Sequence, residues 1–264
     1  SHEREIAIMK VLLTLLDGMR PDALTACGSK FANELLQNTG TYTLTATTVM
    51  PSVTLPCHMS LFHSVPPERH GIVTNIFTPQ VRPVQGICER VRAAGKKAAL
   101  FYDWGELRDL AQPDSLDFGM YISGHTNGFA QAQAKLKETV KSYIRESSPD
   151  FVFFYLGLPD EIGHAKGWMK EDYMKAVHDS METVGEVAGT LPDDYITIIT
   201  ADHGGHGCTH GTDLPEDMTI PILFHGKNLP PIDFGSASIL DIAPTVAKLV
   251  GFECAPEWQG RSLV

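Results

Sequence analysis

Aspartate and histidine residues gather at three points of the sequence, each just after a short apolar run. Asp17 follows VLLTLL, Asp160 and His164 follow FVFFYLGLP, and Asp202 and His203 follow YITIITA. Carboxylate oxygens and imidazole nitrogens in this mixture suit zinc, with manganese as the second choice. The pattern predicts a metal site built from segments that lie far apart in the chain.

The spacing within these groups also favours metal binding. Asp160 and His164 are four residues apart, so one helical turn would bring both to one metal. His206 and His210 follow in the segment DHGGHGCTHG, whose glycines let the backbone bend so that several side chains converge. Both histidines are therefore candidate ligands.

Each group alone has an ordinary structural explanation. A single carboxylate after a strand more often caps a helix, and pairs four residues apart are common on helix surfaces. The three groups together, all at expected strand ends, favour a metal site. Four histidines lack such neighbours and are expected to be surface or structural residues: His2, His125, His178 and His225.

A candidate nucleophile lies in the segment MPSVTLPCHMS. Pro56 is well suited to the first turn of a helix, which would place the Thr54 hydroxyl at a helix N-terminus, where an anion is favoured. The alternative is that Thr54 only caps this helix. Cys57 is a rival nucleophile, but it falls inside the expected helix and is interpreted as a core thiol.

Apolar runs alternate with helical stretches along the chain. Strands are expected at Val11–Asp17, Thr41–Thr48, Lys97–Tyr102, Phe151–Gly157, Tyr195–Thr200 and Ile220–Phe224. Helices are expected at Pro21–Asn38, Gly128–Glu146, Glu171–Ala188 and Ile239–Val250. This order predicts an α/β fold with a mainly parallel central sheet and helices on both faces. In such sheets the ligand site lies beyond the carboxyl ends of the strands, where the aspartates fall.

Composition limits the possible partners. The 264 residues are 43% hydrophobic and carry a net charge of −11, which argues against binding a nucleic-acid polymer. An acidic protein that binds a phosphate ester needs a local positive charge, which bound divalent metals supply. The sequence has no apolar run of membrane-spanning length, so no membrane association is expected. The oligomeric state is not predicted.

The cysteines and the N-terminus bear on cellular location. The 5 cysteines include no CxxC pair, which favours reduced thiols in a cytoplasmic protein, with export after removal of a leader as the alternative. Within residues 1–8, the first two resemble the remnant of a purification tag. A single catalytic domain is expected over residues 1–264, and residues 78–125 are the only place for a small lid.

Five segments carry a resemblance to a known family. They are LLDGMRPDAL, PSVTLPCHMSLFHSVPPERHGIVTN, LPDEIGHAKG, TADHGGHGCTHG and SILDIAPTVAKLVG. Together they resemble the alkaline phosphatase superfamily, in its type I phosphodiesterase/nucleotide pyrophosphatase family, in the family's order and from end to end. The chain is similar to a compact member without a large cap domain.

The resemblance implies two metal sites. One would be held by Asp17, Asp202 and His203, with the Thr54 oxygen as its reactive ligand. The other would be held by Asp160, His164 and His210. Many family members place the last histidine far downstream, so His206 is the runner-up for that position. The resemblance also assigns Asn75 as the side-chain amide that donates to a phosphoryl oxygen.

The function implied is metal-dependent hydrolysis of a small phosphorylated substrate through a phospho-threonine at Thr54, of the phosphodiesterase/nucleotide pyrophosphatase type. The alternatives are a phosphomonoesterase, a phosphonate monoester hydrolase or a cofactor-independent phosphomutase. A sulfatase would need a CxPxR-like segment, which TLPCHMS does not offer. A non-catalytic metal-dependent binding protein is disfavoured because all the expected ligands are present.

Overall fold

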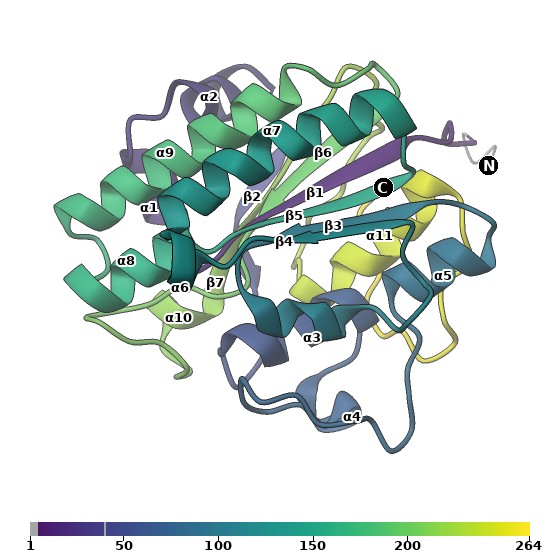
Figure 1. Ribbon diagram of the computed structural model, residues 1–264, viewed down its shortest axis with the longest axis horizontal. Coiled ribbons are helices and arrows are strands. Elements are labelled where there is room, and N and C mark those ends of the chain that lie inside the picture. The colour runs from purple at the N-terminus through teal and green to yellow at the C-terminus, as the bar shows by residue number, and fades with distance from the viewer. Residues whose placement is uncertain (1–4, 40) are drawn as a thin grey trace.

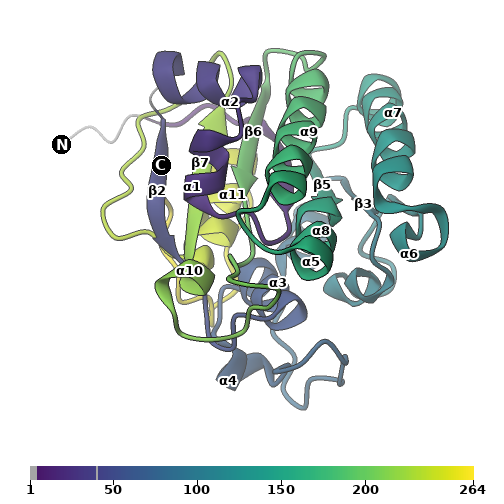
Figure 2. The ribbon, with the colours of Figure 1, turned by 90° about the vertical axis from the view of Figure 1, so that its left-hand side faces the viewer.

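A seven-stranded sheet forms the centre of the computed structural model, which describes residues 5–39 and 41–264. The strand order is β2-β7-β6-β1-β5-β3-β4 (Figure 1), and β7 runs antiparallel to both its neighbours while β1, β3, β4, β5 and β6 pair in parallel. Figure 2 shows β2 and β3 toward opposite edges of this sheet. The strands are β1 Lys10–Leu16, β2 Tyr42–Thr47, β3 Ala98–Tyr102, β4 Phe118–Tyr121, β5 Phe151–Leu156, β6 Tyr195–Thr200 and β7 Thr219–His225.

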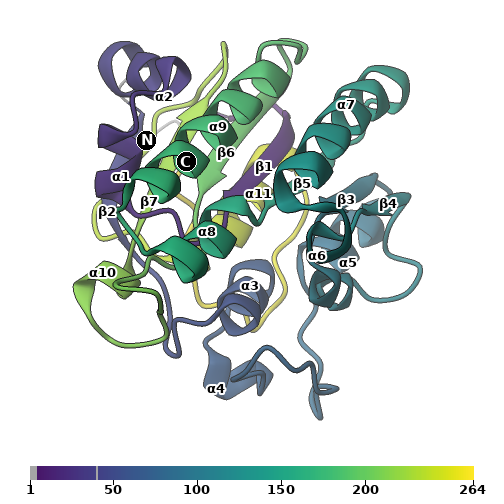
Figure 3. The ribbon, with the colours of Figure 1, turned by 60° about the vertical axis from the view of Figure 1, so that its left-hand side comes forward.

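Helices cover both faces of the sheet, as Figures 1 and 3 show. One layer contains α1 Pro21–Ala26, α2 Lys30–Glu34, α7 Phe129–Ser147, α8 Leu158–Lys166 and α9 Glu171–Ala188. The other contains α3 Thr54–His63, α5 Ile87–Ala93 and α11 Ile242–Val250. Shorter helical segments are η1 Leu35–Thr39, α4 Pro67–His70, η2 Gly105–Leu110, α6 Gly124–Asn127, α10 Pro215–Met218 and η3 Ile239–Asp241. The predicted α/β class is confirmed.

The central strands are almost entirely buried because helices cover both of their faces. All residues of β5 and β6 are buried, as are all but the first of β1. Parallel strands enclosed in this way have near-continuous hydrophobic sequences. The same feature made these strands recognisable in the sequence.

The first predicted helix is interrupted. The expected helix at Pro21–Asn38 ends at Ala26, and α2 begins three residues after Cys27. Gly28 adopts a left-handed backbone conformation, with a φ of +75, which ends the first segment. Ser29 then caps α2 by accepting a hydrogen bond from Ala32 N–H. The prediction of one continuous helix was therefore wrong.

Residues 78–125, considered above as a possible lid, contribute to the core. They contain α5, β3 and β4, and β3 pairs in parallel with β5 at the centre of the sheet. Strand β4 was not predicted, because its four residues alternate between half-buried and exposed and therefore lack a continuous apolar run. None of the described helices is long and apolar enough to cross a membrane.

Candidate active site

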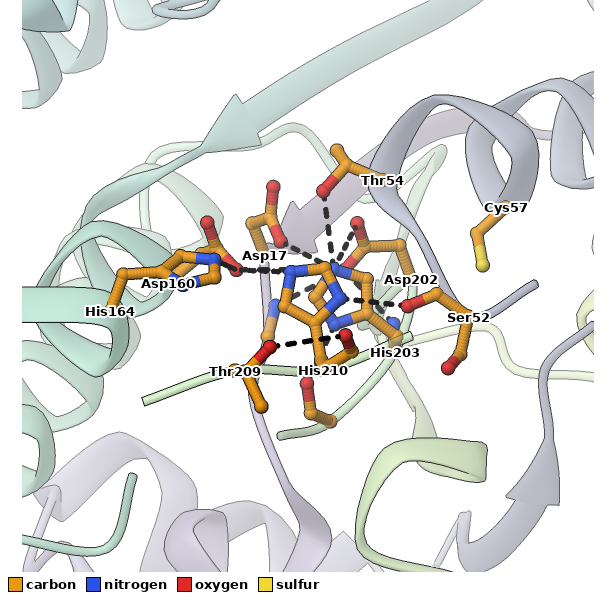
Figure 4. A network of polar contacts seen from close by, with 12 residues as sticks. Asp17, Ser52, Thr54, Cys57, Asp160, His164, Asp202, His203, Thr209 and His210 are labelled. Atoms are coloured by element: carbon orange, nitrogen blue, oxygen red, sulfur yellow. Dashed lines mark hydrogen bonds and ion pairs between the residues drawn. The ribbon is translucent and has the colours of Figure 1, made fainter. Parts of the chain in front are cut away.

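The Nε2 atom of His203 lies at the centre of a group of oxygen atoms (Figure 4). It is 3.1 Å from Oδ1 of Asp17, 3.3 Å from Oδ2 of Asp202 and 3.9 Å from Oδ1 of Asp160. The hydroxyl oxygen of Thr54 lies 3.2 Å from the same nitrogen. The aspartates and His203 follow β1, β5 and β6, which are neighbours in the sheet, and Thr54 begins α3. The structure thus brings together the three groups found in the sequence.

Three histidines are oriented by backbone carbonyls so that Nε2 faces the carboxylates. The Nδ1 atoms lie next to the carbonyl oxygens of Gly204 for His203 (2.6 Å), Ser52 for His210 (2.7 Å) and Cys208 for His164 (3.0 Å). A carbonyl can only accept, so each Nδ1 carries a proton and Nε2 is the nitrogen that faces the carboxylates. Metal-binding histidines are typically held in this way by their second nitrogen.

The residues fit divalent cations. Oδ1 of Asp17, Oδ1 of Asp160 and Oδ2 of Asp202 are buried and have no hydrogen-bond partner in the described part of the chain. Buried carboxylate oxygens without donors are unfavourable unless a cation satisfies them. Two groups of three residues each have ligand atoms that all lie within 4.8 Å of one another. The first group is Asp17, Asp202 and His203, and the second, which shares His203, is Asp160, His203 and His210.

His164 stands beside the second set. Its Nε2 lies 3.4 Å from Oδ1 of Asp160, one helical turn earlier on α8, and Nε2 of His210 lies 3.3 Å from the same oxygen. His206 lies elsewhere: its Nδ1 is 2.7 Å from Oδ1 of Asp217. Of the two candidates in the glycine-rich loop, His210 is therefore the one that joins the cluster.

Close packing of charges shifts the acidity of these groups. Burial, reinforced by Asp17, raises the pKa of Asp202 well above its usual range. Burial opposes charge on His203, but the Asp202 and Asp17 carboxylates outweigh it and raise its pKa to about 10. Burial also opposes ionisation of Asp160, yet the His164 and His210 rings beside its carboxylate outweigh burial and lower its pKa. A cation bound at Nε2 of His203 must therefore displace a proton.

Thr54 is the first residue of α3 and only 4% exposed. The N-cap position is Val53, and no side chain caps the helix, so the interpretation of Thr54 as a simple cap is wrong. Its hydroxyl is directed at His203 instead (Figure 4). The rival nucleophile, Cys57, is fully buried, and burial raises the pKa of its thiol, which disfavours the reactive thiolate.

Asn75 lines a cavity of about 190 Å³ together with Thr54 and Asp160. Its Oδ1 accepts a hydrogen bond of 3.0 Å from the N–H of Leu55, which leaves its NH₂ group as a donor. Leu55 N–H is thereby occupied, and Pro56 has none. These two residues therefore offer no free N–H group to an anion at this end of α3.

Sequence reasoning missed several cavity residues. Trp104, His125, Phe129, Tyr155 and Glu161 also line it. His125, expected to be a surface or structural histidine, is exposed but faces this cavity, with its ring 5.0 Å from that of Phe129. Trp104 follows β3, a strand that ends at the same edge of the sheet, which was a usable signal. Tyr155 lies hidden within the apolar run of β5, and its hydroxyl donates to Oδ2 of Asp17.

The other expected surface histidines lie away from the cluster. His178 is half-buried beside Asp179, and His225 ends β7. His2 lies outside the described residues. A further histidine, His58, lies beside the cluster: it is fully buried, with Nδ1 2.8 Å from the carbonyl oxygen of Thr54 and 3.5 Å from Oδ2 of Asp202.

Comparisons with known proteins match two parts of the chain to family models. Residues 11–104 match the family model of type I phosphodiesterase / nucleotide pyrophosphatase, and residues 122–254 match that of the metalloenzyme superfamily. The phosphopentomutase of Clostridium kluyveri is 27% identical over 148 residues, covering 55% of this chain and 36% of that protein. Ectonucleotide pyrophosphatase/phosphodiesterase family member 1 of Rattus norvegicus is 27% identical over 220 residues, covering 73% of this chain and 24% of that protein.

The chain spans well under half of the length of these two curated relatives, 36% and 24%. The solved structure of murine ectonucleotide pyrophosphatase / phosphodiesterase 5 has the same fold, with a TM-score of 0.76 at 17% identity, covering 94% of this chain and 96% of that one. The family resemblance inferred from the motifs is confirmed. The chain belongs to the metalloenzyme superfamily, with an alkaline-phosphatase-like fold and, over residues 11–104, the sequence of a type I phosphodiesterase / nucleotide pyrophosphatase.

Proposed function

We propose that this chain is a hydrolase of phosphate esters of the phosphodiesterase/nucleotide pyrophosphatase type, with Thr54 as its nucleophile and two divalent cations as cofactors. The observation that carries the proposal is the Thr54 hydroxyl 3.2 Å from Nε2 of His203, which itself lies among three carboxylates. The match of residues 11–104 supports it, as does the solved murine relative, whose structure contains AMP.

The reaction has two displacements. The oxygen of the Thr54 hydroxyl attacks phosphorus, the bond to the leaving ester oxygen breaks, and the hydroxyl proton passes through solvent to that leaving oxygen. Water then attacks the phospho-threonine, which releases phosphate or a monoester and restores the hydroxyl. Divalent cations, when bound, lower the pKa of the attacking hydroxyl and stabilise the leaving oxygen. Asn75 donates its NH₂ group to an oxygen of the phosphoryl group as negative charge builds up.

The ligand set favours zinc, with manganese second. Asp17, Asp202 and His203 would hold one cation, and Asp160, His164 and His210 the other. Mixed carboxylate and imidazole ligands are common in catalytic zinc sites. Since Nε2 of His203 also lies near Asp160, both cations would sit close to this one ring.

The substrate is proposed to be a small phosphodiester. The cavity of about 190 Å³ suits a small molecule rather than a nucleic-acid polymer, and no Lys or Arg is among its described lining residues. A monoester would bring a second negative charge without a cationic side chain to neutralise it. Two arginines of the family-like segments do not line the cavity and have other partners. Arg20 donates hydrogen bonds to Asp22 and to the carbonyl of Gly205, and Arg69 donates to the carbonyl of Arg82.

The five cysteines are all free thiols, which supports a reducing compartment such as the cytoplasm. No protein, nucleic-acid or membrane partner is proposed.

A comparison of substrates tests the proposal. The zinc-loaded protein is assayed with bis(p-nitrophenyl) phosphate, p-nitrophenyl phosphate and p-nitrophenyl phenylphosphonate. The diester is expected to be turned over fastest. Faster turnover of the monoester or the phosphonate would favour those branches of the superfamily, and conversion of ribose 1-phosphate to ribose 5-phosphate would favour a mutase, in line with the phosphopentomutase relative. Metal binding without turnover of any substrate would indicate a binding protein.

A further inference from the structure

Trp168 lies next to the active site, between two residues with left-handed backbone conformations. It follows α8 and lies between Gly167, with a φ of +100, and Met169, with a φ of +64. A left-handed conformation is unfavourable for a residue such as methionine and persists only where the surroundings impose it. These two turns direct the indole into the protein, where it is only 3% exposed.

Hydrogen bonds connect Trp168 to two segments that carry the proposed ligands. Its indole N–H donates to the carbonyl oxygen of Gly18 at 2.9 Å, directly after Asp17. Its backbone N–H donates to the carbonyl oxygen of Gly207 at 2.7 Å, in the loop between His203 and His210. The residue therefore links the turn after β1 with the loop after β6.

The indole also packs against two proposed ligands. Its ring lies edge-on to the ring of His164, with centroids 5.0 Å apart, and to that of His210, with centroids 5.7 Å apart. Trp168 therefore contacts the rings of both histidines. Rings packed in this way have little freedom to rotate away from the carboxylates.

Two glycines leave the space that the indole fills. A Cβ added to Gly163 would come within 2.7 Å of the ring, and one added to Gly205 would come closer still. Neither glycine has a positive φ, so backbone conformation does not require glycine there. Gly163 immediately precedes His164, and Gly205 lies two residues after His203. Glycine at these two positions, each close in sequence to a proposed ligand, therefore leaves the room that the Trp168 ring occupies.

We propose that Trp168 is a positioning residue of the metal centre. It touches no reacting atom and is not itself among the described residues that line the cavity. It fixes the mutual placement of the turn after Asp17, the end of α8 and the loop after His203, so that their ligand atoms converge. The inference rests on the proposed function, since it presupposes that these ligands bind metal.

The test compares the zinc affinity of Trp168→Phe with that of Trp258→Phe. Trp258 is a matched control because its indole N–H also donates to a backbone carbonyl, that of Gln85 at 2.8 Å, away from the ligands. Loss of a group that orients metal ligands typically weakens metal binding by roughly 10- to 100-fold. Affinity is expected to fall by about 10-fold or more in Trp168→Phe and to stay unchanged in Trp258→Phe.

A spectroscopic measurement keeps the proposal testable if Trp168→Phe does not fold. The double variant Trp104→Phe/Trp258→Phe retains Trp168 alone, and its fluorescence is followed during zinc titration. A change in emission that saturates with metal binding is expected, because ligation changes the imidazole rings that contact the indole. Unchanged emission at full occupancy, or equal zinc affinities of the two single variants, would overturn the inference. If the unaltered protein binds no zinc, the proposed function itself fails.

Discussion

The side-chain oxygen of Asn75 accepts a hydrogen bond from the backbone N–H of Leu55, the residue that follows Thr54, at 3.0 Å. One end of α3 therefore carries the proposed nucleophile and holds the proposed phosphoryl-oxygen donor. Because Oδ1 is the acceptor in this bond, the orientation of the amide is fixed and its NH₂ group remains available. The loop that carries Asn75 is attached to the helix at the point where the chemistry is proposed to occur.

This relationship makes Asn75→Asp informative. Aspartate keeps an oxygen for Leu55 N–H but replaces the NH₂ donor by a second carboxylate oxygen. We expect kcat on the diester to fall by roughly 10²-fold, the usual effect of removing one such donor, while the metal content is unchanged. Steady-state kinetics and elemental analysis measure both. Asn228→Asp, on the surface, is the control, and a kcat of Asn75→Asp close to that of this control would argue against the donor role.

The sequence was sufficient to predict the centre of the sheet and most of the residues that the structure brings together at its edge. β1, β5 and β6 are buried on both faces, so their apolar runs are easy to recognise. Asp17 follows β1 directly, and Asp202 follows β6 after one residue. Since parallel neighbours end at the same edge, the order of the motifs was enough to bring these groups together. Local spacing was sufficient for His164, which shares one turn of α8 with Asp160.

The remaining features depend on tertiary contacts that periodicity does not encode. The sequence pattern cannot show that His125 faces the cavity, because its position follows from the path of the chain after β4. Tyr155 looks like one more apolar residue of β5 until the structure pairs its hydroxyl with Asp17. The break after Ala26 depends on a left-handed Gly28, which a helical pattern of apolar residues does not reveal.

Thr54→Ala is expected to abolish turnover without loss of metal. The substitution removes the atom that bonds to phosphorus, while every proposed aspartate and histidine ligand remains. Turnover should fall on the order of 10³-fold or more, as for other enzymes that lose their nucleophile, and Thr54→Ser should retain part of it. Since Thr54 does not cap α3, the melting temperature should change little.

The control for this variant is Thr74→Ala, the same chemical change on the exposed neighbouring loop. It should leave turnover close to that of the unaltered protein. If Thr54→Ala keeps near-normal turnover with its metals bound, a bound water would replace Thr54 as the attacking group.

His210→Gln and His206→Gln separate the two candidate ligands of the glycine-rich loop. Nε2 of His210 faces Asp160 at 3.3 Å, whereas His206 is paired with Asp217. We expect His210→Gln to bind about one cation where a two-metal site holds two, and His206→Gln to keep both. Elemental analysis after dialysis against a metal-free buffer measures this. Metal loss in His206→Gln alone would reverse the assignment.

The last prediction concerns the effect of pH on stability through His70, which lies outside the metal cluster. It is 2% exposed, its Nδ1 accepts from Ile72 N–H at 3.1 Å, and its Nε2 lies 3.0 Å from the hydroxyl of Ser60. Burial, with a further contribution from His63, lowers its pKa to about 4 from the ordinary 6.5. Between these two values the unfolded chain binds a proton that the folded chain does not. Acidification through this window therefore lowers the free energy of unfolding, by up to about 1.4 kcal/mol per pH unit for one group.

Urea unfolding at pH 7, 6 and 5, with a chelator present so that metal release does not contribute, measures this dependence. His70→Gln retains a side-chain donor and acceptor but cannot titrate, so its unfolding free energy should fall less steeply between pH 6 and pH 5. His178→Gln, beside Asp179 on α9, replaces a histidine without touching the Ser60 contact and should keep the slope of the unaltered protein. If His70→Gln has that same slope, His70 is not the buried neutral histidine that the structure describes, because removal of a group that binds a proton only on unfolding must flatten the curve.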